Sequence, residues 1–98
     1  MREVKGTMAI SDEKLEMIKA ISSFERRIED MHLTFQKYRI GQVTTMPEWQ
    51  KLEEELLTFS RRKIYEVVIS KNLDRLLYKF QSRKKLWLNW VEEFQGSG

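Results

Sequence analysis

The sequence predicts an all-α protein, an antiparallel three-helix bundle with coiled-coil-like packing. The main observation is a set of apolar residues that alternate at spacings of four and three over three heptads. These residues are Met17, Ile21, Phe24, Ile28, Met31, Phe35 and Tyr38. A shorter stretch after Pro47 repeats this pattern, and the C-terminal third resumes it. Since a narrow apolar stripe needs a partner helix along its length, each stripe is expected to pack on the others.

Length and composition suit one soluble domain. The 98 residues are enough for one hydrophobic core, and the contents of 41% hydrophobic and 34% charged residues are typical of a helical globular protein. The absence of cysteine excludes disulfides and thiolate metal sites. No stretch reaches the roughly 18 apolar residues of a membrane span, and the N-terminal segment lacks the apolar centre of a signal peptide. A cytoplasmic location is therefore expected.

The first helix is expected over residues 12–40. Residues 1–10 show no apolar periodicity and are expected to form a flexible tail. Ser11 can cap the helix because its hydroxyl accepts a hydrogen bond from a free backbone N–H. Gly41 can adopt the left-handed conformation that ends a helix.

The second helix is expected over residues 46–70. Thr45 and Glu48 have the spacing of a capping box, and Pro47 needs no hydrogen-bond donor in the first turn. The heptad pattern in this helix consists of Trp49, Leu52, Leu56 and Phe59. After Phe59 the pattern changes phase, which fits a four-residue stutter.

The third helix is expected over residues 73–95, so that residues 11–95 form one domain. Its apolar positions are Leu73, Leu77, Phe80, Trp87, Val91 and Phe94, with Lys84 as the one polar residue among them. A single helix over residues 46–94 would be roughly 73 Å long, far longer than its partner, so a reversal near residues 70–73 with Asn72 as cap is expected. The alternative is a helical hairpin whose long second helix dimerises. Residues 96–98 resemble an engineered linker.

No constellation of an enzyme or a metal site is evident. His32 lies beside the apolar stripe of the first helix, and one imidazole without convergent partners is not a catalytic site. Glu53, Glu54 and Glu55 point about 100° apart on a helix and cannot converge on one metal ion. We therefore expect a non-catalytic protein with no cofactor, no bound metal and no small-molecule substrate.

A basic ridge is predicted on the third helix. Residues 61–85 contain nine basic and two acidic residues. Four of the basic residues recur every four positions: Lys71, Arg75, Lys79 and Arg83. Like charges at this spacing cost roughly 0.2–0.5 kcal/mol per pair, which hints at an anionic partner. Neutralisation by neighbouring helices is favoured over a nucleic-acid site, because no aromatic residues alternate with the basic ones.

The C-terminal aromatic segment is the predicted partner surface. It comprises Leu86, Trp87, Leu88, Trp90 and Phe94. These side chains cover a wider arc than one partner helix needs, and tryptophan is enriched at interface hot spots. The predicted function is therefore a protein-protein interaction, adaptor or regulatory module that binds a protein or self-associates as a homo-oligomer through this segment. A nucleic-acid-binding accessory protein that uses the basic ridge is the alternative.

Overall fold

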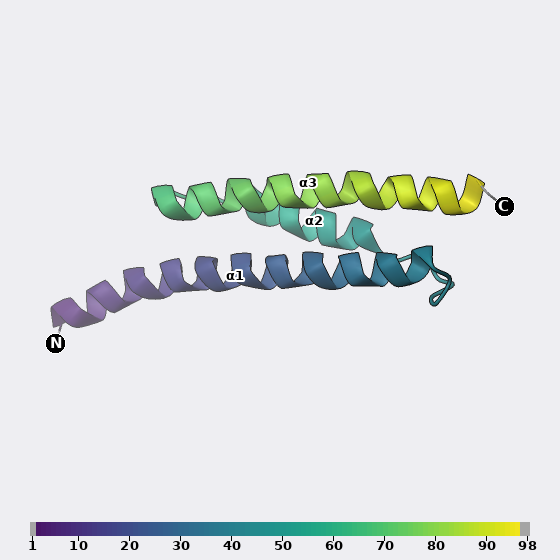
Figure 1. Ribbon diagram of the computed structural model, residues 1–98. Helices are drawn as coiled ribbons and strands as arrows, with labels where there is room; N and C mark the ends of the chain where they lie inside the picture. Colours follow the sequence, from purple (N-terminus) through teal and green to yellow (C-terminus); the bar gives the residue numbers. More distant parts are fainter. Residues whose placement is uncertain (1, 97–98) are drawn as a thin grey trace.

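The computed structural model describes the backbone of residues 2–96 and the side chains of residues 12–94. Within that range it contains three helices, α1 (Arg2–Arg39), α2 (Trp49–Ser60) and α3 (Val67–Gly96), and no strand. α1 and α3 run in the same direction, and α2 returns antiparallel to both (Figure 1). The predicted three-helix bundle is therefore confirmed. Ser97 and Gly98 of the predicted linker lie outside the described residues.

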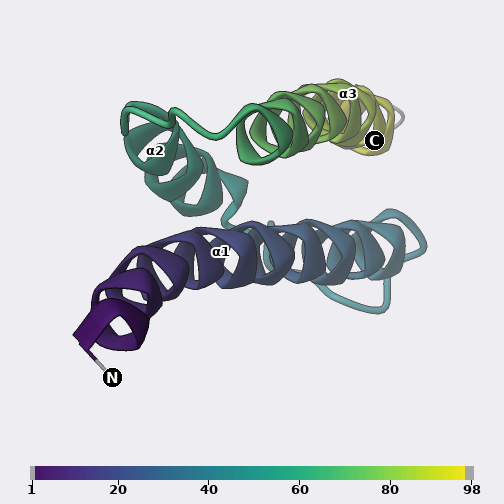
Figure 2. The same ribbon diagram turned by 90° about the vertical axis from the view of Figure 1, so that its left-hand side faces the viewer.

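The three helices differ greatly in length. α1 has 38 residues, α2 has 12 and α3 has 30, which correspond to roughly 57, 18 and 45 Å at 1.5 Å per residue. α2 therefore accompanies only the middle of the pair formed by α1 and α3. Viewed nearly along the helices, α2 lies on one side of that pair (Figure 2). All three helices pack together over only a short part of the 65 Å length of the molecule.

Gly41 ends α1 as predicted. Its φ of +84° lies in the left-handed region, where a residue with a side chain is strained. The Gly41 N–H donates to the carbonyl of Tyr38 at 3.1 Å, and the Gln42 N–H donates to the carbonyl of Lys37 at 2.8 Å. This pair of bonds is a Schellman motif, which satisfies two carbonyls at the helix end.

The predicted starts of the first two helices are wrong. α1 begins at Arg2, so Ser11 lies inside the helix and is not its cap. α2 begins at Trp49, and Glu48 at its N-cap position makes no side-chain capping bond. The Trp49 N–H instead donates to the carbonyl of Pro47 at 3.1 Å, and Pro47 is buried. The proline packs inside the bundle, so the chain turns into α2 later than a capping box at Thr45 requires.

The reversal between the second and third helices also lies earlier than predicted. Residues 61–66 connect α2 to α3, and Asn72 is inside α3. The Val68 N–H donates to the Glu66 carboxylate at 2.8 Å, so Glu66 caps α3 and places negative charge at its positive end. The phase change after Phe59 marks a helix end, not a stutter. This break excludes the alternative with one continuous second helix.

The heptad stripes form the core. Every predicted stripe residue of α1 is buried except Met31, which is partly buried. In α3 the stripe shifts, because Ile69, Leu76 and Trp90 are buried and Phe94 is exposed. The centre of the core is an aromatic stack. The ring of Trp87 lies parallel to Phe35 at 4.9 Å and meets Phe80 edge-on at 5.9 Å.

Ion pairs join α2 to its neighbours. The Lys84 ammonium lies 2.7 Å from the Glu53 carboxylate and 4.9 Å from the centre of the Trp49 ring. This contact explains a lysine at an otherwise apolar position of α3, because its charge is paired where its stem is packed. On the other side of α2, Arg27 forms two hydrogen bonds to Glu55, at 2.9 and 3.1 Å. Two of the three consecutive glutamates therefore bridge helices.

Replacing Trp87 with alanine tests the core. Trp87 is fully buried, so Trp87→Ala is expected to lower the free energy of unfolding by about 3–5 kcal/mol through lost packing and a residual cavity. Tyr78→Ala is the matched control, because Tyr78 is 76% exposed on the same helix and should change stability by no more than about 0.5 kcal/mol. Urea denaturation measures both, and equal effects would contradict this account of the core.

Candidate protein-binding surface

Both tryptophans of the predicted partner surface are buried within their own chain. Trp87 is 0% exposed and Trp90 is 9% exposed. The prediction that these two rings form part of an exposed partner surface is therefore wrong. The physical reason is that α1 is long enough to lie alongside the whole C-terminal half of α3, where Phe35 and His32 receive the two rings. Tyr38 also lies against Phe94, with ring centres 5.0 Å apart.

His32 fixes the position of Trp87. The indole N–H of Trp87 donates to Nδ1 of His32 at 3.0 Å, and the Trp90 ring lies 5.4 Å from the imidazole. Since an indole nitrogen can only donate, Nδ1 must accept, and His32 is neutral in this arrangement. The sequence placed His32 at the border of the core but did not indicate this partner. Its position one turn after Ile28 and one before Phe35 was the available signal.

The surroundings of His32 oppose its protonation. Burial lowers the pKa of the imidazole below its ordinary value, and the nearby Arg83 guanidinium lowers the pKa further. The carboxylate of Glu29 acts in the opposite direction. A neutral imidazole therefore persists to lower pH than it would in an unfolded chain.

Glu29 neutralises half of the predicted basic ridge. Its carboxylate forms an ion pair with Lys79 and lies 3.3 Å from Arg83. The hydrogen bond from Lys79 is the main cause of a lowered pKa at Glu29. Among the described side chains, Lys71 and Arg75 have no ion-pair partner, and both are exposed. Two residues of the basic ridge, Lys79 and Arg83, therefore pair with α1, and the other two are exposed to solvent.

Contacts across the pair fix the register of α1 on α3. Glu29 meets Arg83 and His32 meets Trp87, so partners differ in number by 54 and 55. Ion pairs near the two ends agree, since Lys14 with Glu66 gives a difference of 52 and Arg39 with Glu93 gives 54. The Glu29–Lys79 ion pair gives a difference of 50, so a residue of α1 lies level with residues of α3 about 50 to 55 positions later.

A second, partly apolar side of α1 points away from α2. Phe24 faces α2, where its ring lies 5.5 Å from Phe59. Leu15 and Leu33 are each nine residues from Phe24, which is two and a half helical turns, so they lie on the opposite side of α1. Both are exposed.

The side of α3 that faces away from α2 lies beside this side of α1. Arg75 is nine residues before Lys84, the residue that contacts α2, and therefore points in the opposite direction. Val68 and Leu86 share the side of Arg75, at spacings of seven and eleven residues. We call the combined surface the α1/α3 face. Its residues are Leu15, Ile18, Lys19, Glu25, Arg26, Glu29, Leu33 and Ile40 from α1 and the residue after it, and Val68, Arg75, Lys79 and Leu86 from α3.

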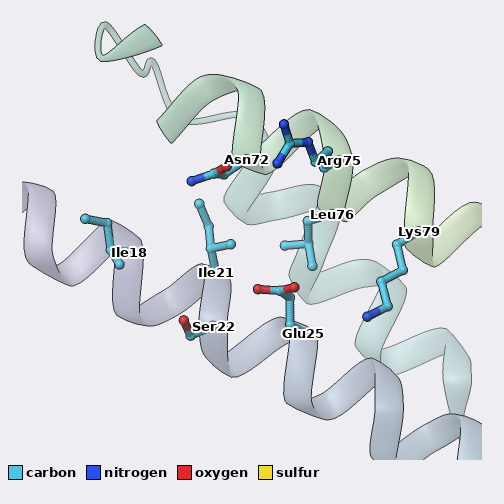
Figure 3. Close-up of a pocket in the computed structure, with 8 residues that line it drawn as sticks. All are labelled: Ile18, Ile21, Ser22, Glu25, Asn72, Arg75, Leu76 and Lys79. Carbon is cyan, nitrogen blue, oxygen red and sulfur yellow. The ribbon is translucent and has the colours of Figure 1, made fainter. Parts of the chain in front are cut away.

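A pocket of about 430 Å³ lies in the α1/α3 face (Figure 3). Apolar side chains from both helices line it, with Ile18 and Ile21 on α1 and Leu76 on α3. Its charged lining residues are Glu25, Arg75 and Lys79. Of the predicted partner residues, Leu86 belongs to this face, whereas Leu88 lies two positions further round α3 and outside it.

Neither the metal-binding side chains nor the comparison with known proteins indicates a second site in the described part of the chain. No group of three or more side chains suited to a metal ion occurs among the described residues, and no described helix has the length and apolar character to span a bilayer. Comparison of the chain with protein-family models, curated proteins and solved structures gave no match. The proposal of a function therefore rests on the α1/α3 face.

The pH dependence of stability tests the His32 contact. Because burial lowers the pKa of His32 in the folded state, His32 stabilises the fold above its unfolded pKa of about 6.5, and this contribution is lost as the pH falls through the folded value. His32→Asn keeps an oxygen that can accept from Trp87 but does not titrate. The urea midpoint is expected to fall more for the original protein than for His32→Asn between neutral pH and about pH 5. Equal losses would show that this contact does not require a neutral imidazole.

Proposed function

We propose that this chain is a non-catalytic interaction module that binds a protein surface through the α1/α3 face. The observation that carries the proposal is the distribution of exposed apolar side chains. Half of the large apolar residues that the described part exposes lie on this one face: Leu15, Ile18, Leu33, Ile40, Val68 and Leu86. Apolar side chains scattered singly need no explanation, whereas a shared face supports a binding role.

The position of α2 explains why this face is bare. A single additional helix can cover only one side of the pair that α1 and α3 form, and α2 lies on the side opposite this face. Leu33 stays 55% exposed although it belongs to α1, and Ile40, directly after α1, is 68% exposed. Covering these side chains would remove apolar area from water, at roughly 25 cal/mol for each Å².

This proposal moves the predicted binding surface without changing the predicted class of function. Leu86 is the residue that the aromatic segment and the α1/α3 face share. The nucleic-acid alternative has weaker support, because Lys79 and Arg83 of the basic ridge lie on the Glu29 carboxylate and would have to leave it to bind phosphate.

Site-specific photo-crosslinking tests the proposal in cells that make the protein. A photoreactive amino acid replaces Leu33 on the α1/α3 face, and in a separate variant it replaces Leu57 on α2. Both leucines are exposed, at 55% and 38%, so each probe is accessible. Irradiation is expected to give covalent protein adducts from position 33, because a bound surface holds the probe within reach.

The variant at Leu57 is the matched control and is expected to give no more than background. Adducts of equal yield from both positions, or none from position 33, would contradict a binding role for the α1/α3 face. A second probe at Leu86 distinguishes the whole face from α1 alone, since both helices should then crosslink to the same partner.

A further inference from the structure

We infer that His32 is an acid-sensitive latch for the C-terminal end of α3, because a neutral imidazole holds residues 86–94 on α1 and an imidazolium releases them. The inference is independent of the α1/α3 face, since it concerns a contact inside the bundle. It follows from which atoms meet at His32 and from which helix holds this end of α3.

The hydrogen bond between Trp87 and His32 requires a neutral imidazole. The indole nitrogen of Trp87 lies 3.0 Å from Nδ1 of His32 and can only donate, so Nδ1 presents its lone pair. The neutral ring therefore carries its proton on Nε2, which lies 3.4 Å from the side-chain nitrogen of Gln36. An imidazolium has an N–H at both ring nitrogens, so turning the ring over cannot restore an acceptor. Protonation replaces the hydrogen bond by two opposed donors.

The C-terminal end of α3 extends past α2 and packs on α1 (Figure 1). α2 begins at Trp49, whose ring centre lies 4.9 Å from the Lys84 ammonium, and it runs from there towards the start of α3. Residues 86–94 lie beyond that level. Phe94, near the end of α3, packs on Tyr38 of α1 at 5.0 Å. This end can therefore leave α1 while the contacts of α2 stay in place.

His32 touches both tryptophans of this end. Its ring centre lies 6.4 Å from that of Trp87 and 5.4 Å from that of Trp90. Both tryptophans are buried, so a charge on the imidazole has little access to water while the end stays closed. The side chain that loses its hydrogen bond in acid is thus one on which the two largest rings of this end rest.

The charged groups that act on His32 do not offset this effect. Burial is the main cause of its lowered pKa, the Arg83 guanidinium of α3 lowers the pKa further, and the Glu29 carboxylate of α1 raises it. Glu29 is already shared by Lys79 and Arg83. Among the described residues, no charged group of α2 contributes to the pKa of His32.

The other charged groups at this end are also engaged. The Arg39 guanidinium lies 4.9 Å from the centre of the Trp90 ring and 3.9 Å from the Glu93 carboxylate. Glu29 and Glu93 are both in ion pairs, so a second N–H on the imidazole must compete with arginine or lysine for either carboxylate.

The size of the effect follows from the ordinary pKa of histidine. His32 is the only histidine of the chain, and Glu29 keeps its charge in mild acid because its pKa lies below the ordinary value. A released His32 titrates near pH 6.5, whereas the closed form resists the proton. The ratio of open to closed chains therefore rises by as much as about 30-fold between about pH 7.5 and about pH 5.

Hydrogen exchange of the full chain, measured by nuclear magnetic resonance, tests the inference. The probes are the indole N–H of Trp87 and the backbone N–H of Val91, with the backbone N–H of Leu73 as the reference near the start of α3. After correction for intrinsic rates, protection at the two probes is expected to be lower than at Leu73 at every pH. It should fall by about 5- to 30-fold between about pH 7.5 and about pH 5.

Two variants separate the latch from ordinary loosening at a helix end. His32→Asn keeps an oxygen that can accept from the indole but does not titrate, so the fall in protection at Val91 should disappear. Trp87→Phe keeps an aromatic ring and removes the donor, so protonation no longer opposes two donors and the fall should become smaller. Circular dichroism confirms that each variant keeps its helices.

Four results would overturn the inference. Protection at Val91 that does not fall in acid, or that falls equally in His32→Asn, would exclude His32 as the group that responds. An unchanged fall in Trp87→Phe would exclude the hydrogen bond as its cause. Equal protection at Val91 and Leu73 at every pH would mean that the chain opens only as a whole, and would exclude a release of one end.

Discussion

The packing of α1 against α3 is the interaction on which the rest of the structure depends. Trp87 sets the register of this pair, because its ring stacks on Phe35 and its indole N–H donates to His32. A large rigid ring with a single donor has few ways to be buried with that donor satisfied. The same register brings Glu29 beside Lys79 and Arg83, so the charged contacts follow from the aromatic one.

The position of α2 on one side of the α1 and α3 pair is the second constraint, because it makes the two sides of the pair different. On one side α2 completes the core with Leu52, Leu56 and Phe59, and ion pairs to Arg27 and Lys84 hold it there. On the other side no described element covers the pair, and apolar residues alternate with charged ones. Such a mixed surface is compatible with a folded single chain and also suited to an interface whose middle is polar.

The sequence predicts well what depends on one helix alone, and less well what depends on a neighbour. The stripe of α1 and the left-handed Gly41 follow from spacing and from backbone preference, and both are confirmed. The start of α3 was misplaced because the signal came from Glu66, a residue type that seldom caps a helix. The burial of Trp90 and the role of His32 depend on which residue of α1 lies opposite, and periodicity in one helix contains no such information. The α1/α3 face was missed because charged residues interrupt its apolar positions.

Solvent paramagnetic relaxation of methyl groups, measured by nuclear magnetic resonance in dilute protein, tests the central claim most directly. That claim is that one chain buries its aromatic core on the α2 side and leaves the methyls of the α1/α3 face in water. A soluble paramagnetic agent should strongly relax the methyls of Leu33 and Leu86 and barely affect those of Ile28 and Leu76, which are buried. Equal relaxation of the two sets, or protection of Leu33 and Leu86 in the monomer, would contradict the account.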